Sequence, residues 1–164
     1  MIKKILIVLL VILVTIQFIH PKKNQSAGEQ PNAIAKAYPV PQEVTDILKV
    51  SCNDCHSNNT HYPWYNNIQP VAWWMNNHVN GGKKELNFDE FTSYTPQRAH
   101  HKLDDLIDEV KEGGMPLPSY TWIHKNAILS EAQKSTLINW AQSVMDSIAS
   151  KYNLPEEEDQ KERP

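Results

Sequence analysis

The residues best suited to chemistry form one short motif. The chain has two cysteines, Cys52 and Cys55, separated by two residues, and His56 follows directly. Two thiols at this spacing on a helical turn can form thioether bonds to the vinyl groups of one porphyrin, and the imidazole that follows can bind its iron. The pattern C-x-x-C-H is typical of covalent c-type haem attachment. It predicts haem c, bound through Cys52 and Cys55, with His56 as an iron ligand.

Three other interpretations of the two cysteines compete with haem attachment. A thioredoxin-like dithiol is expected after a strand in an α/β pattern, which the rest of the chain does not show. A zinc site needs further ligands, and no second C-x-x-C and no H-x-x-x-H pair supplies them. A disulfide between Cys52 and Cys55 would close a very short, strained loop. The sequence therefore favours haem attachment.

The second axial ligand would decide what the iron does. Met115 follows two glycines that can end a helix and precedes a loop stiffened by two prolines. A thioether ligand raises the reduction potential of haem and suits electron transfer. We expect Met115 to be this ligand, with His78 as the strongest alternative. Met75 and Met145 lie in helical patterns, and we expect them to be packing residues.

Aromatic residues gather near both parts of the predicted site. Trp64 and Trp73 follow the cysteine motif, and Tyr120 follows the Gly-Gly-Met-Pro loop. Aromatic rings can cover a porphyrin while their N–H and O–H groups bind its propionates. We therefore predict Trp64, Trp73 and Tyr120 as haem-binding residues. Arg98 and Lys102 could also neutralise a propionate, but we expect them to be solvated charges on a helix surface.

The elements that must position these residues are helices. Apolar spacing and helix-end signals predict helices over residues 41–50, 70–80 (closed by two glycines), 95–112 and 130–148. Strand patterns are almost absent. We therefore predict an all-α fold, a small cytochrome c-like domain around one covalently attached haem, preceded by an N-terminal membrane helix.

The chain divides into four predicted segments. Residues 1–23 contain lysines followed by an apolar run, and no small-residue cleavage site ends that run, so a signal anchor is favoured over a cleaved signal peptide. Residues 24–40 are polar and read as a linker. Residues 41–152 form the haem-binding domain. Residues 153–164 are a charged tail, which we expect to be disordered.

Location and partners follow from the motif and the charge. Because bacteria attach haem c outside the cytoplasm, we expect the domain in the cell envelope, in the periplasm, anchored at the inner membrane or secreted after cleavage. The formal charge is −3, and it becomes −7 without the four lysines of residues 1–23. Such a domain does not suit nucleic acid. We expect a monomeric soluble domain that meets redox partner proteins whose identity the sequence does not give.

Several short motifs resemble those of one known family. They are Ser51-Cys52-Asn53-Asp54-Cys55-His56-Ser57-Asn58, Tyr62-Pro63-Trp64-Tyr65, Gln69-Pro70-Val71-Ala72-Trp73-Trp74, His78-Val79, Leu86-Asn87-Phe88 and Met115-Pro116-Leu117. Together they cover roughly residues 40–145, and they resemble the small exported haem-binding domain proteins of Bacteroidetes-type bacteria, relatives of c-type cytochromes. This resemblance implies covalent haem on Cys52 and Cys55, His56 as axial ligand and an N-terminal anchor. It implies no particular reaction.

Two functions are consistent with these residues. The first is an electron carrier with a six-coordinate haem between His56 and Met115. The second is a haem-based sensor or peroxidase-like enzyme with an open or weakly held sixth position, where His78 or His100 could act as acid or base. The loop around Met115 favours the carrier, so we expect an electron-transfer protein rather than an enzyme, without catalytic residues.

Overall fold

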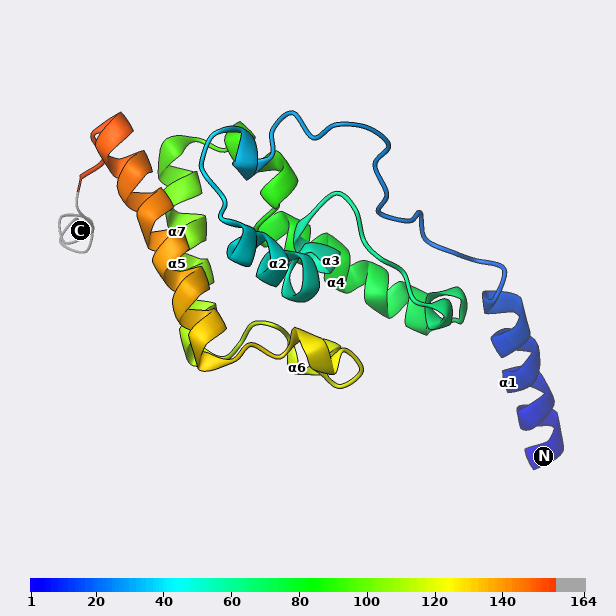
Figure 1. Ribbon diagram of the computed structural model, residues 1–164. Coiled ribbons are helices and arrows are strands. Elements are labelled where there is room, and N and C mark those ends of the chain that lie inside the picture. Colours follow the sequence, from blue (N-terminus) through cyan, green and yellow to red (C-terminus); the bar gives the residue numbers. More distant parts are fainter. Residues whose placement is uncertain (156–164) are drawn as a thin grey trace, which may run out of the picture.

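The described part of the protein is built from helices. A computed structural model describes residues 1–155 (Figure 1). Its α-helices are α1 (Ile2–Ile16), α2 (Gln42–Ser51), α3 (Asn53–His56), α4 (Val71–Glu85), α5 (Pro96–Glu112), α6 (Pro118–Thr121) and α7 (Glu131–Tyr152), and its 3-10 helices are η1 (Ile34–Lys36), η2 (Trp64–Asn67), η3 (Phe88–Ser93) and η4 (Lys125–Ala127). Within residues 1–155, β-type pairing is limited to an isolated bridge between Gln25 and Asn59. The predicted all-α class is confirmed.

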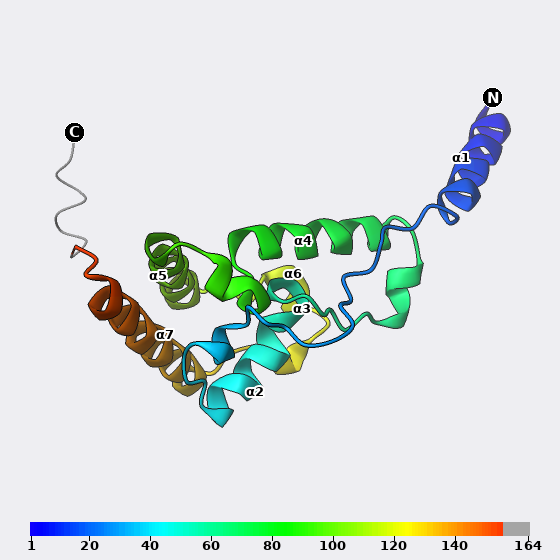
Figure 2. The ribbon, with the colours of Figure 1, turned by 90° about the horizontal axis from the view of Figure 1, so that it is seen from above.

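The hydrophobic core lies mainly between α5 and α7, which pack side by side (Figures 1 and 2). Both helices bury the apolar faces that their spacing predicts, and α2 closes the core from a third side. The buried residues are Leu103, Ile107 and Val110 of α5, Leu137, Trp140, Ala141, Val144, Met145 and Ile148 of α7, and Val44, Ile47 and Leu48 of α2. This core supports one wall of the site described below.

The ends of α5 and α7 follow from local side-chain chemistry. The Thr95 hydroxyl accepts a hydrogen bond from the backbone N–H of Arg98 at the start of α5, and Gly113 ends that helix with φ +78°. At the start of α7, Ser130 and Gln133 form a reciprocal capping box. These caps satisfy backbone groups that a helix end leaves unpaired. The predicted ends of α5 and the predicted start of α7 are therefore confirmed, whereas α7 continues to Tyr152, four residues beyond its predicted end.

Helix α4 is longer than predicted. Gly81 and Gly82 were expected to end it, but the helix continues through both glycines to Glu85. A Cβ atom at Gly82 would lie 2.7 Å from the carbonyl oxygen of Cys55, whereas one at Gly81 would meet nothing within 4 Å. Gly82 thus allows the backbones of α4 and α3 to approach each other closely. The prediction was wrong because this glycine serves helix packing and not helix termination.

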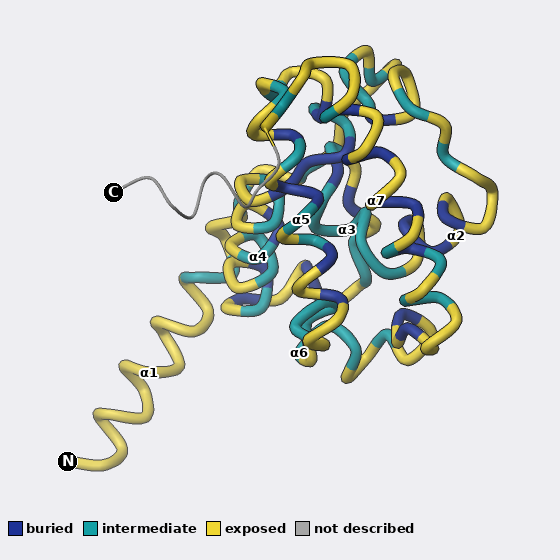
Figure 3. The backbone as a smooth tube through the Cα atoms, turned by 90° about the vertical axis from the view of Figure 1, so that its left-hand side faces the viewer, coloured by how far each residue is buried: buried dark blue, intermediate teal, exposed yellow. Residues whose placement is uncertain are grey.

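The N-terminal helix is shorter than predicted. Helix α1 has 15 residues, none of them buried, and it projects away from the rest of the protein (Figures 1 and 3). At 1.5 Å per residue it is about 22 Å long, less than the roughly 30 Å of a bilayer hydrocarbon core. Within residues 1–155, no helix is long and apolar enough to cross a membrane. The predicted membrane-spanning helix is therefore not supported.

Residues 24–40, which the sequence analysis assigned to a linker, lie against the domain. The side-chain amide of Asn24 donates to the Ser57 carbonyl and to the Thr60 hydroxyl, each at 2.9 Å. Ile34 is buried in the hydrophobic core. The segment is therefore packed, although it has no helical or strand periodicity. Of the tail predicted at 153–164, everything from residue 156 onward lies outside the described residues.

Candidate functional site

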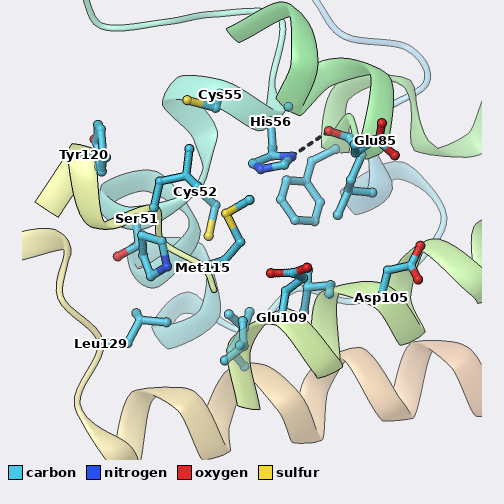
Figure 4. A pocket seen from close by; sticks show the side chains of 18 of the residues that line it. Ser51, Cys52, Cys55, His56, Glu85, Asp105, Glu109, Met115, Tyr120 and Leu129 are labelled. Atoms are coloured by element: carbon cyan, nitrogen blue, oxygen red, sulfur yellow. Dashed lines mark hydrogen bonds between the residues drawn. The ribbon is translucent and has the colours of Figure 1, made fainter. Parts of the chain in front are cut away.

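A cavity of about 500 Å³ lies beside the cysteine motif. Cys52, Cys55 and His56 reach it from the junction of α2 and α3, and Met115 reaches it from the loop after α5 (Figure 4). The volume falls within the range of small-molecule and cofactor sites. The structure therefore brings the two thiols, the imidazole and the predicted sulfur ligand to one cavity.

The backbone of the motif forms a single tight turn. Cys52 is the C-cap residue of α2 and the N-cap residue of α3. Its carbonyl accepts hydrogen bonds from the backbone N–H groups of Cys55 at 3.1 Å and His56 at 2.9 Å. Both cysteines are free thiols. This turn is the arrangement that the spacing predicts for double thioether attachment.

The protonation of the thiols does not suit disulfide exchange. Burial raises the pKa of Cys52 to about 12. Burial, assisted by the Asp54 carboxylate, raises the pKa of Cys55 to about 11. Redox-active dithiols instead have lowered pKa values, because the thiolate is the nucleophile. Within residues 1–155 no group of three or more His, Cys, Asp or Glu side chains is placed to hold a metal ion, so the donor set of a zinc site is not assembled there.

His56 is oriented as an iron ligand should be. Its Nδ1 lies 2.9 Å from the carbonyl oxygen of Leu86. A carbonyl can only accept a hydrogen bond, so Nδ1 carries the proton and Nε2 keeps its lone pair. Burial also lowers the pKa of His56, which favours the neutral imidazole that a metal requires. Histidine ligands commonly have such a backbone partner on the second nitrogen, and the residue therefore fits haem iron.

Met115 is held in place by its own loop. Its backbone N–H donates to the Glu109 carbonyl at 3.1 Å, which folds the loop back onto α5. The end of the Glu109 side chain also lies against Gly114. The side chain of Met115 lies between Cys52 and His56 (Figure 4). Its sulfur thus occupies the same cavity as the imidazole.

His78 also faces the site. It lines the same cavity and a second cavity of about 380 Å³, which shares Cys55 and Tyr120 with the first. Nδ1 of His78 lies 2.8 Å from the Trp74 carbonyl, so Nε2 has its lone pair available. Among the other methionines, Met145 is buried in the core and Met75 lines the second cavity. Of the methionines, and of the histidines other than His56, the ones that line the first cavity in the described structure are Met115 and His78.

Of the three predicted aromatic residues, one reaches the cavity. Tyr120 lines both cavities and donates its hydroxyl to the Asp54 carboxylate at 2.8 Å, and burial together with this carboxylate raises the pKa of Tyr120. Trp64 is 76% exposed, and Trp73 donates its indole N–H to the Ile19 carbonyl. In the described structure, neither tryptophan lines either cavity.

The sequence analysis missed the burial of Lys102. Only 7% of this residue is exposed, and it lines the first cavity, whereas it was expected to be a solvated charge. A signal was available in the spacing, because Lys102 lies three residues after Ala99 and four before Leu106, on the apolar side of α5. Lys102 was expected to be solvated because it is charged, although its spacing places it on the apolar side of the helix.

One comparison with known proteins gave a match. A family described as "Haem-binding domain" matches residues 11–143, a range that contains both cysteines, His56, Lys102 and Met115. No curated protein matches. No solved structure matches.

Proposed function

The chain belongs to the haem-binding domain family, and from this premise we propose that it is a monohaem c-type cytochrome that carries electrons. The observation that carries the proposal is the convergence of Cys52, Cys55, His56 and Met115 on one cavity. The thiols supply the covalent bonds of haem c. The imidazole and the thioether would hold its iron, a combination that raises the reduction potential and suits electron transfer.

Each of these residues has a distinct task in the carrier. When bound, the haem supplies the one-electron chemistry of its iron. Cys52 and Cys55 keep the cofactor attached, so that it is not lost between encounters with partners. The Leu86 carbonyl holds the proton on His56 Nδ1 and keeps Nε2 available. Met115, whose backbone N–H is held by the Glu109 carbonyl, would bind the iron through its sulfur and limit access of other ligands.

We also propose that the domain works in the periplasm with redox partner proteins. The support is indirect, because bacteria attach haem c outside the cytoplasm. Two lysines followed by an apolar segment, here the exposed helix α1, are typical of export segments. This part of the proposal does not require α1 to remain attached to the mature protein.

A haem-based sensor or peroxidase-like enzyme is the second candidate. It is favoured by the position of His78, which lines both cavities and whose Nδ1 lies near the Trp74 carbonyl, so that Nε2 has its lone pair available. If Met115 bound weakly, a small molecule could reach the iron, and His78 could move a proton. The two candidates differ in one measurable property, which is whether the iron has an open coordination position.

The test is the absorption spectrum of the full chain, produced with a haem c maturation system. We expect a low-spin spectrum, a weak far-red sulfur-to-iron band, and little change when carbon monoxide is added to the reduced protein. Met115→Ala should lose the far-red band and bind carbon monoxide. The matched control Met75→Ala, outside the first cavity, should retain the wild-type spectrum.

Either of two results would overturn the proposal that the protein is an electron carrier. A high-spin spectrum of the wild-type protein, or ready binding of carbon monoxide to it, means an open iron and favours the sensor or enzyme. A low-spin spectrum that survives Met115→Ala but is lost in His78→Ala assigns the sixth position to His78.

A further inference from the structure

Lys102 is a buried cation whose ammonium contacts backbone carbonyls. Its ammonium contacts the Glu85 carbonyl, lies 3.4 Å from the Lys84 carbonyl and sits 5.4 Å from the centre of the Tyr94 ring. Within residues 1–155, no carboxylate lies within ion-pair distance of it. Burial and the nearby charge of Arg98 lower the pKa of Lys102, whereas the carboxylates of Glu85 and Asp105, beyond ion-pair distance, act in the opposite direction. Buried ammonium groups are normally paired with an anion, because desolvation of a single charge is costly.

The wall of the first cavity is otherwise acidic. Its carboxylates belong to Asp54, Glu85, Asp105, Asp108, Glu109 and Glu112. In the described part of the chain, Lys102 is the one lysine or arginine in this wall. A ligand with negative groups would be repelled by such a wall unless those groups met Lys102. Haem is such a ligand, since it carries two propionate carboxylates.

The attachment chemistry indicates where these carboxylates would lie. In haem, the propionates stand on the porphyrin edge opposite the vinyl groups that form the thioethers. Cys52 and Cys55 lie at one end of the cavity, and Glu85 and Asp105 lie at the other (Figure 4). The Lys102 ammonium is at the second end, against the Glu85 carbonyl.

We propose that Lys102 binds a propionate carboxylate of the haem. The ion pair offsets the repulsion between the cofactor and the acidic wall, and it gives the ammonium a carboxylate at ion-pair distance, which the described residues do not provide. The proposal rests on haem binding and on attachment through the two cysteines, and it does not depend on electron transfer. A positive charge at this place also favours ferrous over ferric haem and so raises the reduction potential.

Lys102 has a structural task as well, which the test must separate from propionate binding. Its ammonium contacts the last carbonyls of α4, where a cation stabilises the helix end. The next residue is Leu86, whose carbonyl orients His56. Loss of Lys102 could therefore disturb His56 and the spectrum without any contact to the propionate.

The decisive measurement is the crystal structure of the full chain with haem attached. We expect a propionate oxygen within about 4 Å of Lys102 Nζ, the usual limit of an ion pair. If both propionates lie elsewhere and Lys102 binds only backbone carbonyls, the proposal is wrong. If haem is attached but the ion pair is missing, the c-type assignment still holds, so the two failures are distinguishable.

Reduction potentials test the same contact in solution. Lys102→Met should lower the potential with an unchanged low-spin spectrum, and Lys102→Arg should stay close to wild type. Lys36→Met removes the same charge at an exposed surface pair with Glu29, and it should lower the potential much less. Equal shifts of the reduction potential in Lys102→Met and Lys36→Met would overturn the proposal. If Lys102→Met fails to fold, Lys102→Arg and the crystal structure still decide it.

Discussion

Two halves of the domain differ in what covers their apolar side chains. In the packed half, one face of α5 and one face of α7 bury Leu103 and Ile148 completely in the hydrophobic core. In the cavity half, formed by α3, α4, residues 113–130 and the adjoining face of α5, Leu106 and Leu117 line a cavity, and Trp122 remains 73% exposed. The packed half is completed by protein atoms alone. The cavity half keeps apolar surface that a cofactor would cover, so its stability should depend on haem.

The strongest way to break this comparison is to remove haem attachment. Cys52→Ala combined with Cys55→Ala should abolish covalent haem staining on a denaturing gel. The cavity half should then become sensitive to proteases, while α5 and α7 keep their helical signal in circular dichroism. Ser51→Ala keeps both thiols and should retain haem. Persistent staining of the double variant would refute thioether attachment.

The second test compares one leucine from each half on the same helix. Leu103→Ala should lower the free energy of unfolding by about 3 kcal/mol, because it leaves a cavity in a fully packed site. The loss should be the same with and without haem. Leu106→Ala should lower the free energy of unfolding more in the haem-bound protein than in the protein without haem, since this side chain lines the cavity. Denaturant unfolding of both forms measures these values, and an equal haem dependence would contradict the comparison.

The third test uses the two adjacent glycines of α4. Gly82→Ala places a Cβ atom 2.7 Å from the Cys55 carbonyl oxygen, so it should cost about 2 kcal/mol and reduce haem incorporation. Gly81→Ala meets no atom within 4 Å and should stabilise the helix by about 0.5–1 kcal/mol. Thermal unfolding and haem yield are the readouts. Equal effects of the two substitutions on thermal unfolding and haem yield would contradict the close approach of α4 to α3.

The smallest effect is expected far from the cavity. Ser130→Ala removes the capping box of α7 and should cost about 1 kcal/mol, because the backbone N–H of Gln133 loses its acceptor. The spectrum should not change, since Ser130 is outside both cavities. Chemical denaturation checks the cost. An altered spectrum would mean that the packed half and the haem site are coupled more closely than their contacts indicate.

Local signals were the ones that sequence reasoning interpreted correctly. The caps at Thr95 and Ser130 and the apolar faces of α5 and α7 depend on residues within one or two turns, so their spacing was enough. The predictions were wrong where a contact with an element distant in sequence determines the local structure. Gly82 looked like a helix end because its contact with Cys55 is not visible along the chain. Lys102 looked solvated because the carbonyls that receive its ammonium belong to another helix.

The order of residues along the chain determined the motif of Cys52, Cys55 and His56 by itself, since these three residues share one helical turn. The helical class and the capped ends of the long helices were determined in the same way. Only the tertiary structure decided that Met115, His78, Tyr120 and Lys102 share the cavity, and that Trp64 and Trp73 lie outside its wall. The physical reason is that a cavity is enclosed by segments far apart in sequence, and their approach depends on packing that no local pattern encodes.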